Sequence, residues 1–128
     1  MKRFFLAALL LIAGKASLSA QTIEIPFTGD YADPTIVRVG EDFYMTHSSY
    51  NYYPGLLVWH SKDLKKWTPV TRTLHENVGT VWAPDITYTN GKFYIYFPTN
   101  LGGNYVVTAD HIEGPWTTPV KLEVNGID

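Results

Sequence analysis

The sequence of 128 residues contains no cysteine, which excludes a disulfide framework, a thiolate nucleophile and a cysteine-ligated zinc site. It contains no Gly-x-Ser-x-Gly nucleophile elbow, and Gly102-Gly103 is not followed by the pattern of a phosphate-binding loop. No set of metal ligands is visible, since His60, His75 and His111 lack ligand-like spacing. Amphipathic helical periodicity of useful length is missing from the chain after residue 20. The sequence therefore does not support serine-nucleophile chemistry, phosphate binding or a helical fold.

Apolar and aromatic side chains are abundant. They make up 45% and 15% of the residues respectively, a composition typical of a folded protein with a packed core. Short β-branched and aromatic runs bounded by turn residues predict a nearly all-β chain. Asn90-Gly91 and Gly40-Glu41-Asp42 predict tight reversals, because Asn and Gly tolerate positive φ. The predicted strands span residues 35–39, 43–48, 56–60, 70–73, 86–88, 93–98, 105–108 and 118–122.

Residues 1–20 have the pattern of a secretory signal peptide. Lys2 and Arg3 precede an apolar run over residues 4–13, and a stretch of small residues follows it. The apolar run is too short to cross a bilayer core of about 30 Å, and Lys15 interrupts it. We take Gln21 as the mature start, with the cleavage site defined to about one residue. The chain is therefore predicted to be secreted or periplasmic, with no membrane association after cleavage.

Positive charge is scarce in the predicted mature chain. The whole sequence has a net charge of −2, and cleavage removes three basic residues and no acidic ones. Seven basic residues then face twelve acidic ones, a net charge of −5. Affinity for nucleic acid depends on Lys and Arg side chains that neutralise phosphates, so nucleic acid is not expected as a partner. A neutral or cationic ligand fits this charge better.

The predicted strands repeat with a period of about fifty residues. Residues 34–44 open with Pro-Thr-Ile and reverse into Phe-Tyr, and residues 84–94 open with Pro-Asp-Ile and reverse into Phe-Tyr. Residues 58–70 and 107–120 match each other in the same way. Four strands in about 45–50 residues is the period of a β-propeller blade. We therefore predict two blades of a propeller.

The repeat also predicts where carboxylates gather. The first strand of each propeller blade lines the central channel, so the residues that open successive first strands converge on the axis. Asp33, Ala83 and Asp128 occupy these positions, which allows two acids to lie close enough for glycosidic hydrolysis. Gly126-Ile127-Asp128 stands where a third unit would open. We expect a fragment, because two blades cannot close a ring that needs at least about four.

Five short motifs follow one another: Tyr31-Ala32-Asp33-Pro34-Thr35-Ile36, Pro54-Gly55-Leu56, Trp59-His60-Ser61-Lys62-Asp63-Leu64 with Trp67, Trp82-Ala83-Pro84-Asp85-Ile86 and Gly91-Lys92-Phe93-Tyr94. In this order and at these spacings they resemble the opening of glycoside hydrolase family 43. That family has a five-bladed β-propeller and includes β-xylosidases, α-L-arabinofuranosidases and endo-arabinanases. The resemblance covers residues from about 30 to 128, and it implies that residues 21–128 are the N-terminal part of such a domain.

The resemblance implies roles for two carboxylates. Asp33, in an Ala-Asp-Pro motif, would be the general base that activates water for an inverting displacement. Asp128, in what resembles the start of an Ile-Asp-Pro motif, would orient the general acid and keep it protonated by like-charge repulsion. The general acid itself, a glutamate of a later blade, is absent, so the 128 residues alone are expected to be inactive. No cofactor is predicted, although a central metal ion occurs in parts of the family and stays open here.

Other residues are predicted to contact the substrate or to support the site. Tyr50, in the ring-rich stretch 47–55, and Trp82 offer ring faces on which the C–H surface of a sugar can stack. His47 is predicted to border the pocket, and Asp85 is predicted to be a structural carboxylate near it. The remaining tryptophans are predicted to pack between strands and blades; they are Trp59, Trp67 and Trp116.

The predicted function is hydrolysis of O-glycosidic bonds in plant polysaccharides or their oligosaccharides. Within the family, residues 47–56 resemble the exo-acting members, which favours a β-xylosidase or α-L-arabinofuranosidase that acts on xylan or arabinan side chains. One alternative is a non-catalytic carbohydrate-binding propeller, which would keep Tyr50 and Trp82 and have no need for Asp33. A second is a structural or protein-interaction propeller, in which the repeats alone matter.

Overall fold

The computed structural model describes residues 28–124. The predicted signal peptide at residues 1–20, the predicted mature start at Gln21 and the carboxylate of Asp128 lie outside the described residues. All regular secondary structure between residues 28 and 124 is β-strand. That part of the chain contains no helix with the length and hydropathy of a transmembrane span.

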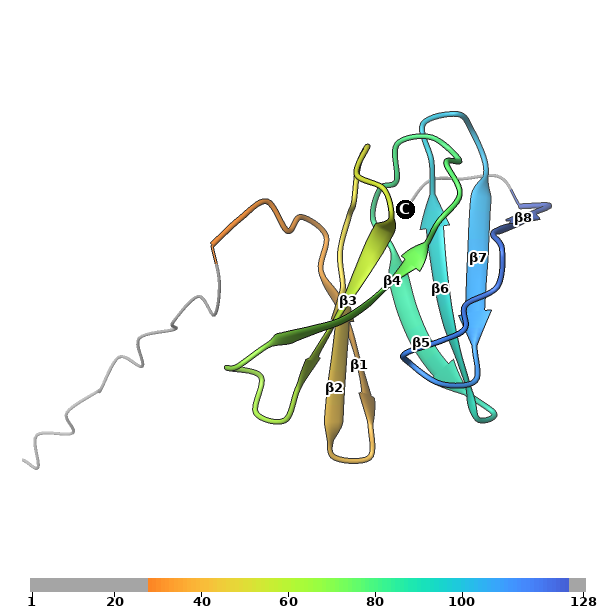
Figure 1. Ribbon diagram of the computed structural model, residues 1–128. Coiled ribbons are helices and arrows are strands. Elements are labelled where there is room, and N and C mark those ends of the chain that lie inside the picture. Colours follow the sequence, from red (N-terminus) through yellow and green to blue (C-terminus); the bar gives the residue numbers. More distant parts are fainter. Residues whose placement is uncertain (1–27, 125–128) are drawn as a thin grey trace, which may run out of the picture.

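Eight strands in the described part of the chain form two four-stranded antiparallel sheets, which stand side by side in Figure 1. Strands follow chain order within each sheet, so each neighbouring pair is consecutive in the sequence. The nearly all-β prediction is confirmed, and every predicted strand overlaps an observed one. The first sheet comprises β1 (Thr35–Val39), β2 (Asp42–Thr46), β3 (Gly55–Ser61) and β4 (Thr68–Leu74), and the second comprises β5 (Asp85–Thr89), β6 (Lys92–Pro98), β7 (Asn104–Ala109) and β8 (Val120–Leu122).

The last strand is shorter than predicted. A strand was expected over residues 118–122, whereas β8 begins at Val120. Pro119 has no backbone N–H and cannot donate to a ladder, so regular pairing starts after it. Ahead of Pro119, the chain contacts β7 outside the regular ladder: the backbone N–H of Thr117 donates to the Thr108 carbonyl at 2.9 Å.

The predicted repeat is confirmed by the strand register. Thr35 pairs with Thr46 in the first sheet, and Asp85 pairs with Tyr96 in the second, so each residue has its counterpart fifty positions later. Both first hairpins reverse at the predicted glycines. Asn90 and Gly91 have φ values of 51° and 77°, the conformation that a two-residue hairpin loop requires.

An apolar core joins the two sheets. Leu56 and Val58 of β3 are fully buried, and they belong to one cluster with Ile86 of β5 and Ile95 of β6. Strand β1 lies against β5, so the first strands of the two sheets are neighbours. Leu57 and Trp59 of the same strand are half-buried and do not belong to this cluster. The second sheet therefore covers only part of the first sheet's side chains.

The backbone also crosses from one sheet to the other. Tyr50 and Val81 form an antiparallel bridge in which each N–H donates to the other carbonyl at 3.0 Å, and Val81 is bridged in turn to Thr99. Val81 is fully buried, so this pairing is shielded from water. The stretch after β2 is consequently fixed beside the segment that leads into β5.

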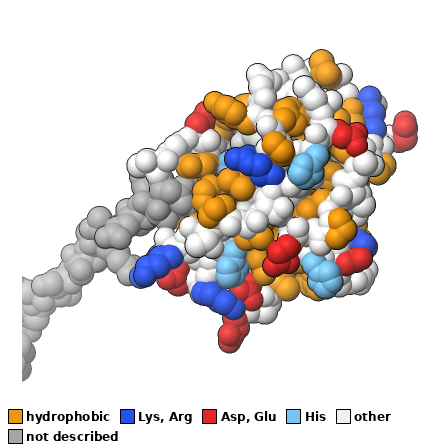
Figure 2. Space-filling view, viewed as in Figure 1, with side chains coloured by type: hydrophobic (Ala, Val, Ile, Leu, Met, Phe, Trp, Pro, Cys, Tyr) orange, Lys and Arg blue, Asp and Glu red, His pale blue; other side chains and the backbone are white. Residues whose placement is uncertain are grey.

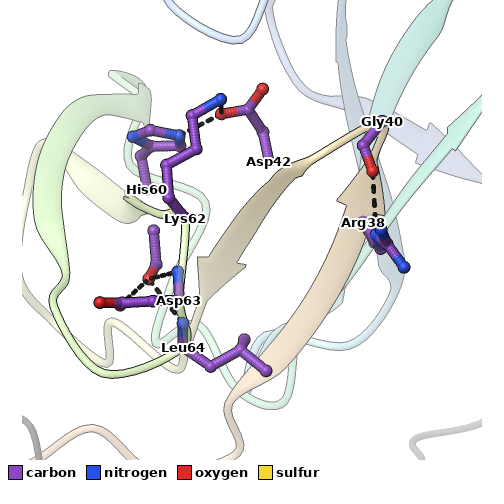
Figure 3. A network of polar contacts seen from close by, with 8 residues as sticks. Arg38, Gly40, Asp42, His60, Lys62, Asp63 and Leu64 are labelled. Atoms are coloured by element: carbon purple, nitrogen blue, oxygen red, sulfur yellow. Dashed lines mark hydrogen bonds and ion pairs between the residues drawn. The ribbon is translucent and has the colours of Figure 1, made fainter.

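Each sheet carries an ion pair at the same place, with the charges exchanged. Asp42 contacts Lys62 at 2.7 Å and His60 at 2.5 Å in the first sheet, as Figure 3 shows. In the second sheet, Lys92 contacts Asp110 at 2.5 Å. The hydrogen bond from Lys62, with a second from His60, holds the pKa of Asp42 below its ordinary value. Because these groups face water, the pairs add little to stability. Acidic and basic side chains are interspersed over the whole face drawn in Figure 2, with apolar ones between them.

We predict that the layer between the sheets dominates stability. Replacing the fully buried Ile95 by Ala should lower the free energy of unfolding by about 2–4 kcal/mol, because it leaves a cavity between the sheets. Ile36→Ala is the matched control, since Ile36 is 49% exposed and its truncation should cost less than about 1 kcal/mol. Urea denaturation followed by tryptophan fluorescence measures both. Equal losses in the two variants would contradict the prediction.

Candidate active site

Asp33 stands two residues before β1, at the end of the strand where the site was predicted. Its backbone φ is 54°, in the left-handed region that few residues other than glycine adopt. Asp is among the side chains that tolerate this conformation. The side chain is exposed, and its Oδ2 accepts a hydrogen bond of 2.6 Å from the hydroxyl of Ser48. A strained backbone at a predicted catalytic carboxylate is a common feature of functional sites.

A hollow of about 450 Å³ is lined by residues of β3 and β4 and by the segments before β1 and after β2. Ser48 connects it to Asp33, because Ser48 lines the hollow and also binds the carboxylate. An aromatic group at its wall consists of Tyr31, His47 and Trp59. The ring of Tyr31 lies edge-on to both others, with its centroid 4.9 Å from that of His47 and 5.7 Å from that of Trp59. Other lining residues are Asp30, Ser49, Tyr50, Tyr52, Leu57 and Arg72.

His47 is buried in this wall, with 6% of its surface exposed. Its Nδ1 lies 2.8 Å from the carbonyl of Ser48, so this nitrogen carries the proton and donates it to the carbonyl. Its Nε2 is buried and has no hydrogen-bond partner among residues 28–124. Burial lowers the pKa of His47 below 6.5, so the ring is neutral at pH 7. His47 therefore presents an acceptor nitrogen that a hydroxyl group of a ligand could satisfy.

Tyr50 also lines the hollow, and its backbone is held by the bridge to Val81. Desolvation raises the pKa of its hydroxyl, and the negative charges of Asp30 and Asp33 raise it further. The hydroxyl is therefore protonated at neutral pH and can donate a hydrogen bond. The two predicted substrate-contacting residues of this stretch, His47 and Tyr50, lie around one hollow.

Trp82 and Asp85 lie on the second sheet's side. Trp82 is half-buried, and its backbone N–H donates to the Pro98 carbonyl at 3.1 Å. It is not among the residues that line the hollow with Tyr50. Asp85 opens β5 and accepts a hydrogen bond of 3.0 Å from the hydroxyl of Thr35. This bond links equivalent positions of the two first strands. The predicted roles of Trp82 in sugar contact and of Asp85 in support of the site stay predictions.

Several residues at this site were not predicted as part of it. Ser48 holds Asp33 although fifteen positions separate them, and Tyr31 and Arg72 enter the hollow from the chain before β1 and from β4. Trp59 was expected to pack between strands and blades; it is half-buried beside Tyr31 and His47 and lines the hollow, and its packing against another blade stays a prediction. Trp116 does pack onto the core, and its indole N–H donates to the Ile112 carbonyl at 3.0 Å.

No group of three or more His, Asp or Glu side chains within residues 28–124 is arranged to hold a metal ion. The hollow instead offers rings and hydrogen-bonding groups without a concentrated charge. Such a lining, in which aromatic rings stand beside placed polar groups, is typical of sites for small ligands.

The family model described as "Glycosyl hydrolases family 43" matches residues 23–128. The chain belongs to glycosyl hydrolase family 43. It is 41% identical over 128 aligned residues to a xylan 1,3-beta-xylosidase of a Vibrio species, covering 84% of this chain and 24% of that one. It is 37% identical over 135 aligned residues to a non-reducing end alpha-L-arabinofuranosidase of Bacteroides ovatus, covering 92% of this chain and 25% of that one. The chain thus spans about a quarter of the length of these curated relatives.

Solved structures of the family share the fold. A Bacteroides ovatus family 43 protein from a xyloglucan utilisation locus superimposes with a TM-score of 0.75 at 34% identity, over 82% of this chain and 24% of that one. A xylan beta-1,4-xylosidase from Bacillus halodurans gives 0.69 at 38% identity, over 77% of this chain and 22% of that one. Family 43 enzymes are five-bladed β-propellers, so the two sheets described here are two blades. The predicted fold and family are both confirmed.

We predict that His47 makes stability depend on pH. The pKa of His47 is lower in the folded chain than in the unfolded one, where it is about 6.5, so below that pH the unfolded chain takes up a proton that the folded chain resists. The free energy of unfolding should therefore fall as the pH drops from 7.5 to 5.5, and His47→Gln should reduce that fall. Urea midpoints at the two pH values measure it.

The matched control for this measurement is His75→Gln, because His75 is exposed and lies outside the hollow. This control should keep the pH dependence of the unchanged chain. If His47→Gln and His75→Gln show the same dependence as the unchanged chain, the neutral, buried state of His47 is wrong.

Proposed function

We propose that this chain supplies the general base and part of the sugar-binding surface of a glycosidase that hydrolyses O-glycosidic bonds with inversion. The single observation that carries the proposal is the location of Asp33. Its carboxylate stands at the opening of the first blade, bound to Ser48, which also lines the ring-walled hollow. Membership of family 43 supports the same reaction class.

In the proposed reaction, Asp33 accepts a proton from a water molecule as that water attacks the anomeric carbon. The bond from that carbon to the leaving oxygen breaks, and the leaving oxygen takes a proton from a general acid, a glutamate of a later blade. An inverting enzyme leaves room for the water by separating base and acid by about 6.5–9.5 Å. Asp128, at the opening of the third unit, would keep that acid protonated by like-charge repulsion.

The sugar would be recognised by rings and by hydrogen bonds from neutral groups. Tyr50, protonated at neutral pH, can donate to a sugar hydroxyl, and Nε2 of His47 can accept from one. Trp82 would offer a ring face near the second blade's first strand. No metal ion or other cofactor takes part in this proposal.

The proposed substrates are xylosides and arabinofuranosides from xylan or arabinan side chains or their oligosaccharides. The named relatives are a xylan xylosidase and a non-reducing end arabinofuranosidase, which supports an exo-acting enzyme for pentose sugars. Secretion or export to the periplasm is proposed from the pattern of residues 1–20, and it suits an enzyme whose polymeric substrate lies outside the cell.

A non-catalytic carbohydrate-binding propeller is the second candidate. The observation that favours it is the ring-rich wall of the hollow, where Tyr31, His47 and Trp59 would bind a sugar without any need for Asp33. A binding module and a hydrolase differ in whether the carboxylate matters.

The test is Asp33→Ala in the protein that the complete coding sequence encodes. Release of nitrophenol from aryl xylosides and arabinofuranosides should fall by about 10³-fold or more, because the water loses its base. Binding of the product sugar, measured by calorimetry, should survive. Asp110→Asn is the matched control, since Asp110 is exposed and pairs with Lys92 at the far end of the second sheet.

Turnover that persists in Asp33→Ala would overturn the proposal and favour another base. Sugar binding in an unchanged protein that hydrolyses neither glycoside would instead favour the binding module. The 128 residues alone should release no nitrophenol, because the proposed general acid belongs to a later blade.

A further inference from the structure

We propose that Ser48 is a positioning residue that holds the carboxylate of Asp33 in the orientation needed to take a proton from water. This inference rests on the proposed function, in which Asp33 is the general base. Ser48 would not contact the reacting atoms and would act only through Asp33. The geometry of the pair, the backbone around it and the repeat between the blades each support this role.

The hydrogen bond between the two side chains is short. Ser48 Oγ lies 2.6 Å from Asp33 Oδ2, within the range of about 2.5–2.7 Å that is typical of a hydroxyl donating to a carboxylate. Ser48 is 1% exposed, whereas Asp33 is exposed. Water therefore has little access to the donor, and the bond fixes one oxygen of a carboxylate that otherwise faces solvent. Oδ1 accepts no hydrogen bond from residues 28–124 and is the oxygen that can receive the proton.

The backbone fixes both partners. Thr35 pairs with Thr46 at the end of the β1–β2 ladder, and two residues further along the same register Asp33 comes opposite Ser48. The backbone N–H of Ser48 also donates to the Ala32 carbonyl at 3.0 Å. Ser48 therefore makes two hydrogen bonds to this segment, one to the backbone of Ala32 and one to the side chain of Asp33. The backbone of Asp33 itself has a φ of 54°.

The second blade shows that this fold does not require the pair. Fifty residues later, the positions of Asp33 and Ser48 are occupied by Ala83 and Pro98, which have neither carboxylate nor hydroxyl. The two segments are still linked through the backbone, but the bond runs the other way: the backbone N–H of Trp82 donates to the Pro98 carbonyl at 3.1 Å, because Pro98 has no N–H to donate. The second blade therefore joins these segments without a side-chain bond. The carboxylate and its donor occur together in one blade and are absent together from the other, which supports a shared chemical role.

The test uses Ser48→Ala in the protein that the complete coding sequence encodes. The kcat for an aryl pentoside should fall about 10- to 100-fold with KM changed less than about twofold, because misorientation of the base affects the transition state and not substrate binding. In the Asp33→Ala background the same substitution should cause no further loss of kcat, since there is no carboxylate left to orient.

The matched control is Thr46→Val, which removes a fully buried hydroxyl two residues away that has no partner among residues 28–124. It should leave kcat within about twofold of the unchanged protein. Ser48→Cys provides a second variant if Ser48→Ala folds poorly, because it keeps the side-chain size and replaces a strong donor by a weak one. It should lower kcat in the same direction without changing KM.

A kcat of Ser48→Ala and Ser48→Cys within twofold of the unchanged protein would overturn the positioning role. A loss that is as large in the Asp33→Ala background as in the unchanged protein would also overturn it, because the hydroxyl would then act independently of Asp33. If Asp33→Ala keeps its activity, the proposed function falls together with this inference. If Asp33→Ala is inactive and Ser48→Ala is fully active, only the inference falls.

Discussion

The apolar layer between the two sheets is the constraint on which the rest of the structure depends. An antiparallel sheet needs a partner layer against which to bury its apolar side chains. Here each sheet buries apolar side chains against the other. Leu56, Val58, Ile86 and Ile95 fill the layer, and the bridge between Tyr50 and Val81 ties the backbone across it. Because this layer fixes β1 against β5, the residues that open the two first strands have fixed positions.

The candidate site lies beside this layer. Leu56 and Val58 of β3 are buried in the core, whereas Trp59 lies beside Tyr31 and His47 around the hollow. Asp33 and Ser48 lie just past the last pair of the β1–β2 ladder, where regular strand geometry no longer restricts them. The residues of the first sheet that build the core and the pair proposed for the chemistry therefore lie at different places in that sheet.

Comparison of the two blades distinguishes features that serve the fold from those that serve the proposed chemistry. Features that recur in both serve the fold: the hairpin register, the reversal at a glycine, and an ion pair that appears as Asp42 with Lys62 in one blade and as Lys92 with Asp110 in the other. The exchange of charge shows that each pair of positions carries opposite charges, whichever position holds the acid. The pairing of Asp33 with Ser48 has no counterpart at Ala83 and Pro98, so its presence in one blade requires a reason other than strand pairing.

The strands, the repeat, the family and the position of Asp33 ahead of the first strand could all be predicted from the sequence, because alternation, turn residues and ordered motifs are local signals. It did not reveal that Ser48 holds Asp33 or that Tyr31, Trp59 and Arg72 share a hollow with His47 and Tyr50. These residues come from strands and loops that meet only when the sheet has formed. Tertiary structure alone settled those contacts, since they depend on which face of the first sheet the second sheet covers.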